Sequence, residues 1–184
     1  MNSILELDAR LSNQMRVAEK PGALRAISVF FAHSGDSWFW VLALLAIWTR
    51  GDPFWKKWAV VEFAGICLLV VMVLVIKFRI RRRRPEGEWG KIYRYTDPHS
   101  FPSGHAARAF LIATIATGLG PPWLAIALWI WAPLVALARV AMGVHYVSDV
   151  VAGALFGILV AWIGLQFYAP LFVWIFRLLG FALW

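Results

Sequence analysis

The sequence is dominated by apolar runs that are long enough to cross a lipid bilayer as helices. A helix needs about 20 mostly apolar residues to span the hydrocarbon core, and four runs are clear, at residues 58–76, 123–138 and 147–167 and, shorter than the others, at 106–119. Hydrophobic residues make up 61% of the chain and its mean hydropathy is +0.70, far above an ordinary soluble domain. Because backbone polar groups in lipid must be paired within their own segment, the sequence predicts an all-α integral membrane bundle.

Three further segments decide how many helices this bundle has. Residues 24–32 and 38–48 are apolar but are separated by the polar sequence HSGD at residues 33–36, so they form either one span or two. Residues 170–184 are expected to turn back as a further helix. We therefore predict about five to six transmembrane helices in one membrane-embedded domain that covers residues 1–184.

The first 20 residues predict a helix that lies on the bilayer surface. Ile4, Leu7, Leu11 and Met15 recur at helical spacing, which brings them near one face of a helix. An amphipathic helix of this kind binds at the membrane interface. The segment lacks the charged start, apolar middle and small-residue cleavage site of a secretory signal. We therefore expect residues 1–20 to form an interfacial helix.

Three polar clusters stand at the ends of the apolar runs. They read KFRIRRRRP at residues 77–85, PSGH at 102–105 and RVAMGVHYVSD at 139–149. The first two flank the same loop, and two crossings separate the second cluster from the third, so all three are expected at one membrane surface. We predict a pocket among helix ends, covered by the loop at 78–101. Strong cations, two histidines and a carboxylate gathered there indicate a site for phosphate-ester chemistry.

Each cluster has a simpler interpretation when it is taken alone. A run of arginines just beyond a span is most often a topology signal that binds headgroups. The sequence Pro-Ser-Gly is a turn and a helix start. A lone histidine near a membrane surface, such as His33 or His99, is usually only solvated or hydrogen-bonded. It is the combination at fixed spacing that favours a catalytic site.

The combination resembles the three-part motif of the type 2 phosphatidic acid phosphatase superfamily, in its membrane lipid phosphatase branch. The matching residues agree with that motif in order, spacing and type, and are Lys77, Arg84 and Pro85, then Pro102, Ser103, Gly104 and His105, then Arg139, His145 and Asp149. One position departs from it, since Ala138 stands where the family usually has serine. This departure puts one phosphate hydrogen bond in doubt. The helical context extends the resemblance over most of the chain.

The two histidines have different roles in this family. The resemblance implies that His145 is the nucleophile and forms a phosphohistidine, and that His105 is the general acid that protonates the departing lipid oxygen. His145 and Asp149 are four residues apart and so share one face of a helix. A carboxylate there can keep one imidazole nitrogen protonated and leave the other free to attack phosphorus.

Phosphoryl transfer otherwise needs positioning and charge neutralisation over the nonbridging oxygens. Lys77, Arg84 and Arg139 supply three cations, and the arginines can bind two oxygens at once. Ser103 and the amide of Gly104, at a helix N-terminus, add neutral donors. These five residues are our candidates for binding phosphate.

Arg108, Asp97 and Glu62 are charged residues outside the matched motif positions. Arg108 follows His105 by three residues, so it should face the bundle interior or the site. Asp97 either positions Arg108 or Arg139 or is a solvated acid of the loop. Glu62 is expected near the opposite membrane surface, with a lysine as a possible partner.

We predict a metal-independent lipid phosphatase that uses no cofactor. The three cations make a divalent metal unnecessary, and no cluster of Asp, Glu, His or Cys has ligand spacing. The resemblance implies phosphatidic acid, phosphatidylglycerol phosphate, an isoprenyl diphosphate or a lipid A phosphate as substrate, and residues 100–110 are most similar to members acting on the last two. Two alternatives remain, a lipid phosphotransferase that uses the same phosphohistidine and a non-catalytic lipid-binding protein.

The formal charge of +8 fits anionic phospholipid or isoprenoid headgroups, and the apolar bulk of the chain argues against nucleic acid. No obligatory protein partner is predicted. In a bacterium the protein would lie in the cytoplasmic membrane. The resemblance favours an extracytoplasmic site, whereas the many cations at residues 79–94, compared with those at 50–57, favour a cytoplasmic one by the positive-inside rule.

Overall fold

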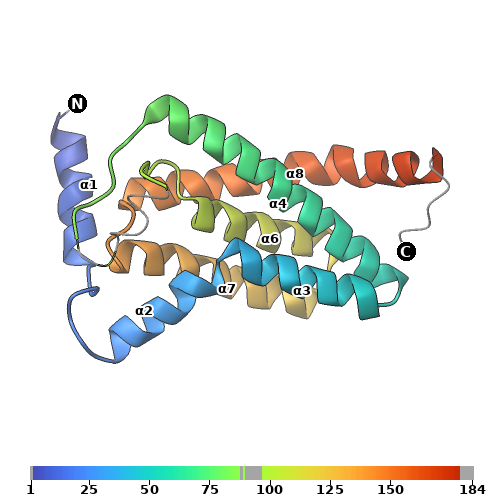
Figure 1. Cartoon of the computed structure of the whole chain (residues 1–184), viewed down its shortest axis with the longest axis horizontal. Helices are drawn as coiled ribbons and strands as arrows, with labels where there is room; N and C mark the ends of the chain where they lie inside the picture. Colours follow the sequence, from blue (N-terminus) through green and yellow to red (C-terminus); the bar gives the residue numbers. More distant parts are fainter. Residues whose placement is uncertain (1, 88, 90–96, 179–184) are drawn as a thin grey trace.

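All regular elements in the computed structural model, which describes residues 2–87, 89 and 97–178, are helices (Figure 1). In chain order they are α1 (Asn2–Gln14), α2 (Ala23–Ser34), α3 (Ser37–Arg50), α4 (Pro53–Ile80), α6 (Gly104–Leu119), α7 (Pro122–Ala141) and α8 (Val147–Leu178). Extended pairing within the described residues is limited to one isolated bridge between Arg83 and His99. The all-α prediction is confirmed.

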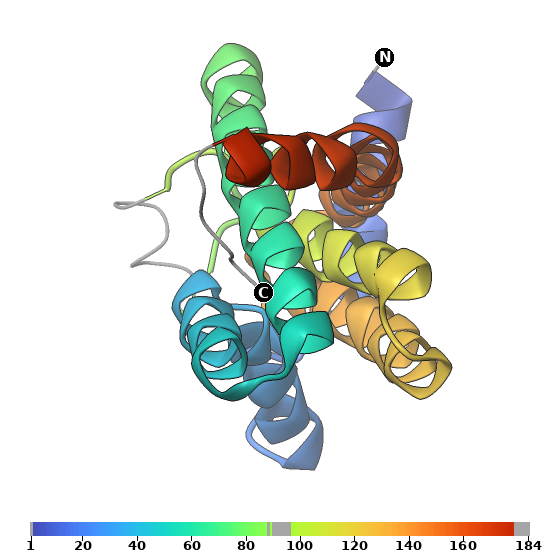
Figure 2. The ribbon, with the colours of Figure 1, turned by 90° about the vertical axis from the view of Figure 1, so that its right-hand side faces the viewer.

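Helix α6 lies at the centre of the bundle, between α7 and α8 and beside α4 (Figure 2). Small residues allow α6 and α8 to approach closely, as is common between helices in membranes. A Cβ at Gly157 of α8 would lie 2.0 Å from the Ala107 carbonyl oxygen, and one at Gly153 would lie 2.5 Å from the Ser103 carbonyl oxygen. This close packing fixes the start of α8 against the start of α6, where two of the polar clusters meet.

Helices α2 and α3 are joined by a short break and are bent by 57° to each other. Gly35, in the break, packs against the bundle, since a Cβ there would lie 2.9 Å from Val135 Cγ1 of α7 and 3.3 Å from His105 Cδ2 of α6. The two apolar segments are thus two helices bent to each other, which reach the length of one span only together, and their number of membrane crossings stays a prediction. The bend points the break into the bundle.

Within the described part of the chain, three helices are long and apolar enough to cross a bilayer alone, namely α4, α7 and residues 147–167 of α8, and the bent pair α2 and α3 is a fourth candidate. Helix α6 has 16 residues and is buried among them. The count of five to six spans stays a prediction. The expected turn at Pro170 is wrong, because α8 continues through that proline to Leu178; the rest of the predicted helix, residues 179–184, lies outside the described residues. Membrane helices tolerate proline where neighbouring groups satisfy the freed carbonyl.

Helix α1 is attached to the bundle through polar contacts at the start of α8. The Val147 amide donates to Ser12 Oγ at 3.0 Å, and the Ser148 amide donates to Asp8 Oδ1 at 3.0 Å. These bonds satisfy amides that a helix N-terminus leaves without partners. Ile4 and Leu7 are exposed, and a position of α1 on the bilayer surface stays a prediction.

Glu62 lies in the middle of the core and not near a lysine. Its side chain is 0% exposed, and neither carboxylate oxygen has a hydrogen-bond partner within the described residues. The expected pairing with a lysine is therefore wrong. The sequence distance from Lys77 indicated the depth of Glu62 along α4 but not the face of the helix on which it lies.

Candidate active site

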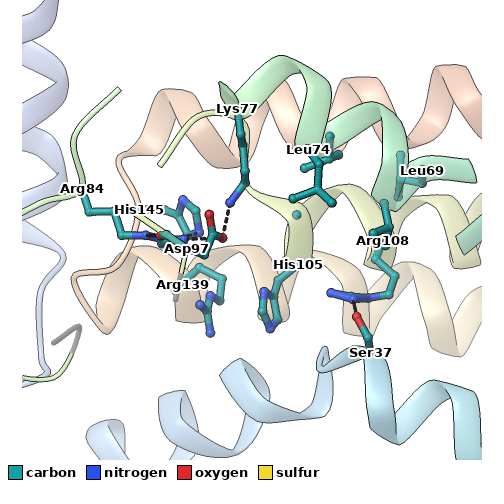
Figure 3. Close-up of a pocket in the computed structure, with 13 residues that line it drawn as sticks. Ser37, Leu69, Leu74, Lys77, Arg84, Asp97, His105, Arg108, Arg139 and His145 are labelled. Carbon is teal, nitrogen blue, oxygen red and sulfur yellow. Dashed lines mark hydrogen bonds and ion pairs between the residues drawn. The ribbon is translucent and has the colours of Figure 1, made fainter. Parts of the chain in front are cut away.

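One cavity of about 200 Å³ gathers residues from all three polar clusters (Figure 3). Eight of the ten candidate residues line it, and these are Lys77, Arg84, Asp97, Gly104, His105, Arg108, Arg139 and His145. The remaining lining is Ser37 together with an apolar wall from α4, formed by Leu69, Val70, Val73 and Leu74. Ser103 and Asp149 lie behind this surface. Residues 88 and 90–96 of the loop predicted over the site lie outside the described residues.

His145 stands in the turn between α7 and α8 and is 1% exposed. Its Nε2 lies 3.2 Å from Arg84 Nη1. Its Nδ1 lies 3.6 Å from Asp149 Oδ2, which is longer than a hydrogen bond. Burial lowers the pKa of His145 well below its ordinary value of 6.5, and the charges of Arg84 and Arg139 act in the same direction. The imidazole is therefore neutral at pH 7, which is the form a nucleophile needs.

Asp149 is engaged by partners that the sequence analysis missed. Arg82 Nη1 donates to Asp149 Oδ1 at 2.8 Å, and the Tyr146 amide donates to Asp149 Oδ2 at 2.9 Å. Arg82 also donates to Asp8 Oδ2 at 2.7 Å and to Ser148 Oγ at 2.6 Å. It stands in a run of four arginines, and no spacing rule distinguished it from its neighbours.

Two of the predicted phosphate-binding cations converge on the carboxylate of Asp97. Arg84 Nη2 donates to Asp97 Oδ2 at 2.7 Å, and Lys77 Nζ donates to the same oxygen. Arg84 Nε also donates to the Asp97 carbonyl at 2.7 Å. Asp97 thus holds Lys77 and Arg84 together, contacts that its position in the loop did not predict. An anionic substrate would meet these cations where a carboxylate now binds.

Ser103 begins α6. Its Oγ accepts a hydrogen bond from the Ala106 amide at 3.4 Å, and its own amide donates to the Asp149 carbonyl at 3.0 Å. The side chain is buried and does not line the cavity, whereas Gly104 does. Ser103 therefore joins the starts of α6 and α8, and a direct contact with phosphate stays a prediction.

His105 is bound by the break between α2 and α3. Its Nε2 lies 2.7 Å from Asp36 Oδ1, and Asp36 Oδ2 lies 3.1 Å from His33 Nδ1. The sequence predicts only a solvated or hydrogen-bonded His33 and indicates no role for Asp36. The sequence signal that could have identified Asp36 is a carboxylate in the short polar break at residues 33–36, between two apolar runs.

Arg108 is fixed by the same break. Its Nε donates to the Gly35 carbonyl at 3.2 Å, and its Nη1 donates to Ser37 Oγ. The side chain lies one turn beyond His105 on α6, at the end of the cavity away from His145 (Figure 3). Arg108 was predicted to face either the bundle interior or the site, and its side chain lines the cavity.

No group of three or more His, Cys, Asp or Glu side chains is positioned to hold a metal ion within residues 2–87, 89 and 97–178. That the reaction uses neither a metal nor a cofactor stays a prediction.

Known proteins resemble this chain in both sequence and fold. The model of the PAP2 superfamily matches residues 58–172. Decaprenylphosphoryl-5-phosphoribose phosphatase of Mycolicibacterium smegmatis is 37% identical over 148 residues, which are 76% of each chain. Lipid A 1-phosphatase of Porphyromonas gingivalis is 35% identical over 113 residues, which are 60% of this chain and 24% of that protein.

A solved structure agrees with the fold. The transmembrane PAP2-type phosphatidylglycerolphosphate phosphatase of Bacillus subtilis superposes with a TM-score of 0.74 at 25% identity, over 92% of this chain and 88% of that one. The fold is thus that of a membrane-embedded hydrolase of phosphoester bonds. The chain belongs to the PAP2 superfamily.

Proposed function

We propose that this protein hydrolyses the phosphomonoester or diphosphate headgroup of a membrane lipid through a phosphohistidine on His145. One observation carries the proposal. A neutral, buried His145 and a carboxylate-bound His105 line the same cavity as three strong cations. Nucleophile, general acid and charge-neutralising groups are the parts that phosphoryl transfer requires.

In the first half-reaction His145 Nε2 attacks phosphorus and the bond to the lipid oxygen breaks. His105 gives its proton to that oxygen. Lys77, Arg84 and Arg139 neutralise the charge on the nonbridging oxygens, where rigid cations out of water act strongly. In the second half-reaction water attacks the phosphohistidine, its proton goes to His105, and inorganic phosphate leaves.

Asp36 acts in this scheme as a positioning residue. With Nε2 of His105 bound to Asp36, the Nδ1 nitrogen is left to face the departing oxygen. His105 must be protonated to serve as the acid, yet its burial and the nearby charges of Arg139 and Arg108 oppose a positive imidazole. The carboxylate of Asp36, which is bound to Nε2, acts in the opposite direction and favours the protonated form.

The apolar wall of the cavity supports a lipid as substrate. Leu74 of α4 lines the cavity and also an outer groove with Val71, Val75 and Phe78, so apolar surface continues from the site to the lipid-facing side of α4. The relatives named above act, by their names, on lipid A and on a decaprenyl lipid. A phosphate headgroup at His145 with its chain along α4 fits this arrangement.

Phosphate release by the purified protein in detergent with EDTA tests the proposal. Wild type and His145→Ala are compared on phosphatidic acid, phosphatidylglycerol phosphate, farnesyl diphosphate and lipid A. We expect release by the wild type that the substitution abolishes. Release that survives in His145→Ala, or that requires a metal, contradicts the mechanism. Phosphate that appears on an acceptor lipid instead of in solution would identify a phosphotransferase.

We also infer that the site faces away from the cytoplasm in a bacterial host. The resemblance supports this orientation, and the arginines of residues 79–84 that engage acids and carbonyls at the site need not act as a topology signal. A cysteine in place of the exposed Pro98, in a Cys67→Ala background, should react with an impermeant maleimide on intact spheroplasts. Labelling only after lysis would mean that the site faces the cytoplasm.

A further inference from the structure

His105 divides the cavity into two parts that differ in chemistry (Figure 3). On one side Lys77, Arg84 and Arg139 surround His145. On the other side lie Arg108 and Ser37, next to the apolar wall of α4. The phosphorus atom under attack must be beside His145 and the leaving oxygen beside His105, so the second side is where the leaving group lies.

Arg108 is a cation on this leaving-group side. Its side chain is 5% exposed, and no carboxylate of the described residues forms an ion pair with it, since Asp36, the acid that acts on it at longer range, is bound to His105. Two of its five N–H groups are used by Gly35 and Ser37, which leaves three donors. A buried cation without a paired acid within a membrane protein is costly and by default indicates a ligand.

The order His145, His105, Arg108 along the cavity (Figure 3) indicates which kind of lipid headgroup fits. In farnesyl monophosphate or phosphatidic acid the atoms directly beyond the leaving oxygen are carbons, which give a guanidinium no partner, and in lipid A or phosphatidylglycerol phosphate they are sugar or glycerol carbons that carry neutral groups. In a diphosphate the next group is a second phosphate, which matches the planar donors of arginine. We propose that Arg108 binds the phosphate that stays with the lipid, so that the preferred substrate is a lipid diphosphate and the product is the lipid monophosphate. This inference rests on the proposed function and narrows its substrate.

The reaction balances with the residues of the cavity. His145 Nε2 forms a bond to the terminal phosphorus, and the bond from that phosphorus to the bridging oxygen breaks. The electron pair stays on the bridging oxygen, which takes the proton of His105 and leaves as the lipid monophosphate. Arg108 neutralises the charge that develops on this leaving phosphate. Water then releases inorganic phosphate and returns a proton to His105.

The test compares farnesyl diphosphate with farnesyl monophosphate, which have the same chain. Arg108→Gln should lower kcat/KM for the diphosphate by about 30-fold or more, as loss of a charge-assisted contact does, and by a factor at least ten times smaller for the monophosphate. Arg108→Lys should recover part of the loss. Arg50→Gln, which removes an exposed guanidinium at the far end of α3, should change neither value.

Equal losses on the two substrates would overturn the inference, because they would mean that Arg108 only fixes the break between α2 and α3. Absence of any loss would overturn it as well. If Arg108→Gln does not fold, inhibition of the wild type decides, and a farnesyl methylenediphosphonate should bind at least about tenfold more tightly than farnesyl phosphonate. Equal inhibition contradicts the subsite.

The wild type separates this inference from the proposed function. If the wild type hydrolyses phosphatidic acid but does not prefer farnesyl diphosphate to the monophosphate, the diphosphate subsite is contradicted and the proposed phosphatase activity stands. If the wild type releases phosphate from none of the lipids, the proposed phosphatase function itself is contradicted.

Discussion

Arg82 donates a hydrogen bond to Asp149 at 2.8 Å and so connects the segment after α4 to the carboxylate beside His145. The same guanidinium binds Asp8 of α1, and Asp8 in turn accepts from Ser148. Helix α1 is thereby linked through Asp8 and Arg82 to Asp149, the residue that we propose to orient His145. Such outer contacts commonly hold catalytic groups in a productive geometry.

Replacement of Arg82 by alanine should lower kcat by roughly tenfold, because Asp149 loses the cation that fixes its carboxylate. KM should change little, since Arg82 does not line the cavity. The matched control is Arg83→Ala, which removes an exposed arginine one position along. Steady-state kinetics on one lipid substrate measure both. Equal effects of the two substitutions would mean that Arg82 contributes charge alone.

Replacement of Asp8 by alanine should loosen α1 from the bundle. Hydrogen bonds from Ser148 and Arg82 lower the pKa of Asp8 despite its burial, so its stabilising contribution is present above the ordinary pKa of 3.8 and is lost as pH falls through the lower folded value. At pH 7 we expect a loss of about 1–3 kcal/mol of stability. Thermal unfolding in detergent measures it, with Glu6→Ala on the exposed face as control. A melting temperature equal to that of the wild type would exclude the attachment.

The pH profile should report the neutral state of His145. Burial and the neighbouring cations lower the pKa of His145, so the group loses its nucleophilic form only well below pH 6.5, and the acid limb of kcat/KM should lie there. Arg84→Gln removes one cation and should move this limb upward, towards 6.5, in addition to lowering the plateau. Profiles from pH 4 to 8 on the same substrate test this, and Arg83→Gln should leave the limb in place. A limb that moves down, or not at all, contradicts the assignment.

Replacement of Asp36 by asparagine should have an effect that depends on the leaving group. Without the carboxylate, His105 is a weaker acid catalyst, so hydrolysis of an alkyl ester such as phosphatidic acid should fall by about 100-fold. Hydrolysis of p-nitrophenyl phosphate, whose leaving group needs no proton, should fall by less than about fivefold. His33→Gln, which alters the other partner of Asp36, is the control. A similar loss on both substrates would assign Asp36 a purely structural role.

The helices and the motif residues could be predicted from the sequence because their signals are local. Apolar runs defined α4, α7 and α8, and the number of crossings between the clusters indicated one shared surface. The contacts of Asp36 and Arg82 could not be predicted in this way. They depend on a 57° bend between α2 and α3 and on the attachment of α1 to α8, which only tertiary packing determines. The continuation of α8 through Pro170 was missed because proline ends helices more readily in water than in lipid.

The most direct test of the account is to trap the phosphorylated enzyme. Wild type and His105→Ala are mixed with a substrate labelled on its terminal phosphate, quenched in alkali within milliseconds and digested. We predict an acid-labile, alkali-stable phosphoryl group on the peptide that contains His145, more abundant in His105→Ala if its second step is slower, and absent from His145→Ala. Turnover by the wild type with no labelled His145, or label that remains in His145→Ala, would contradict the central claim.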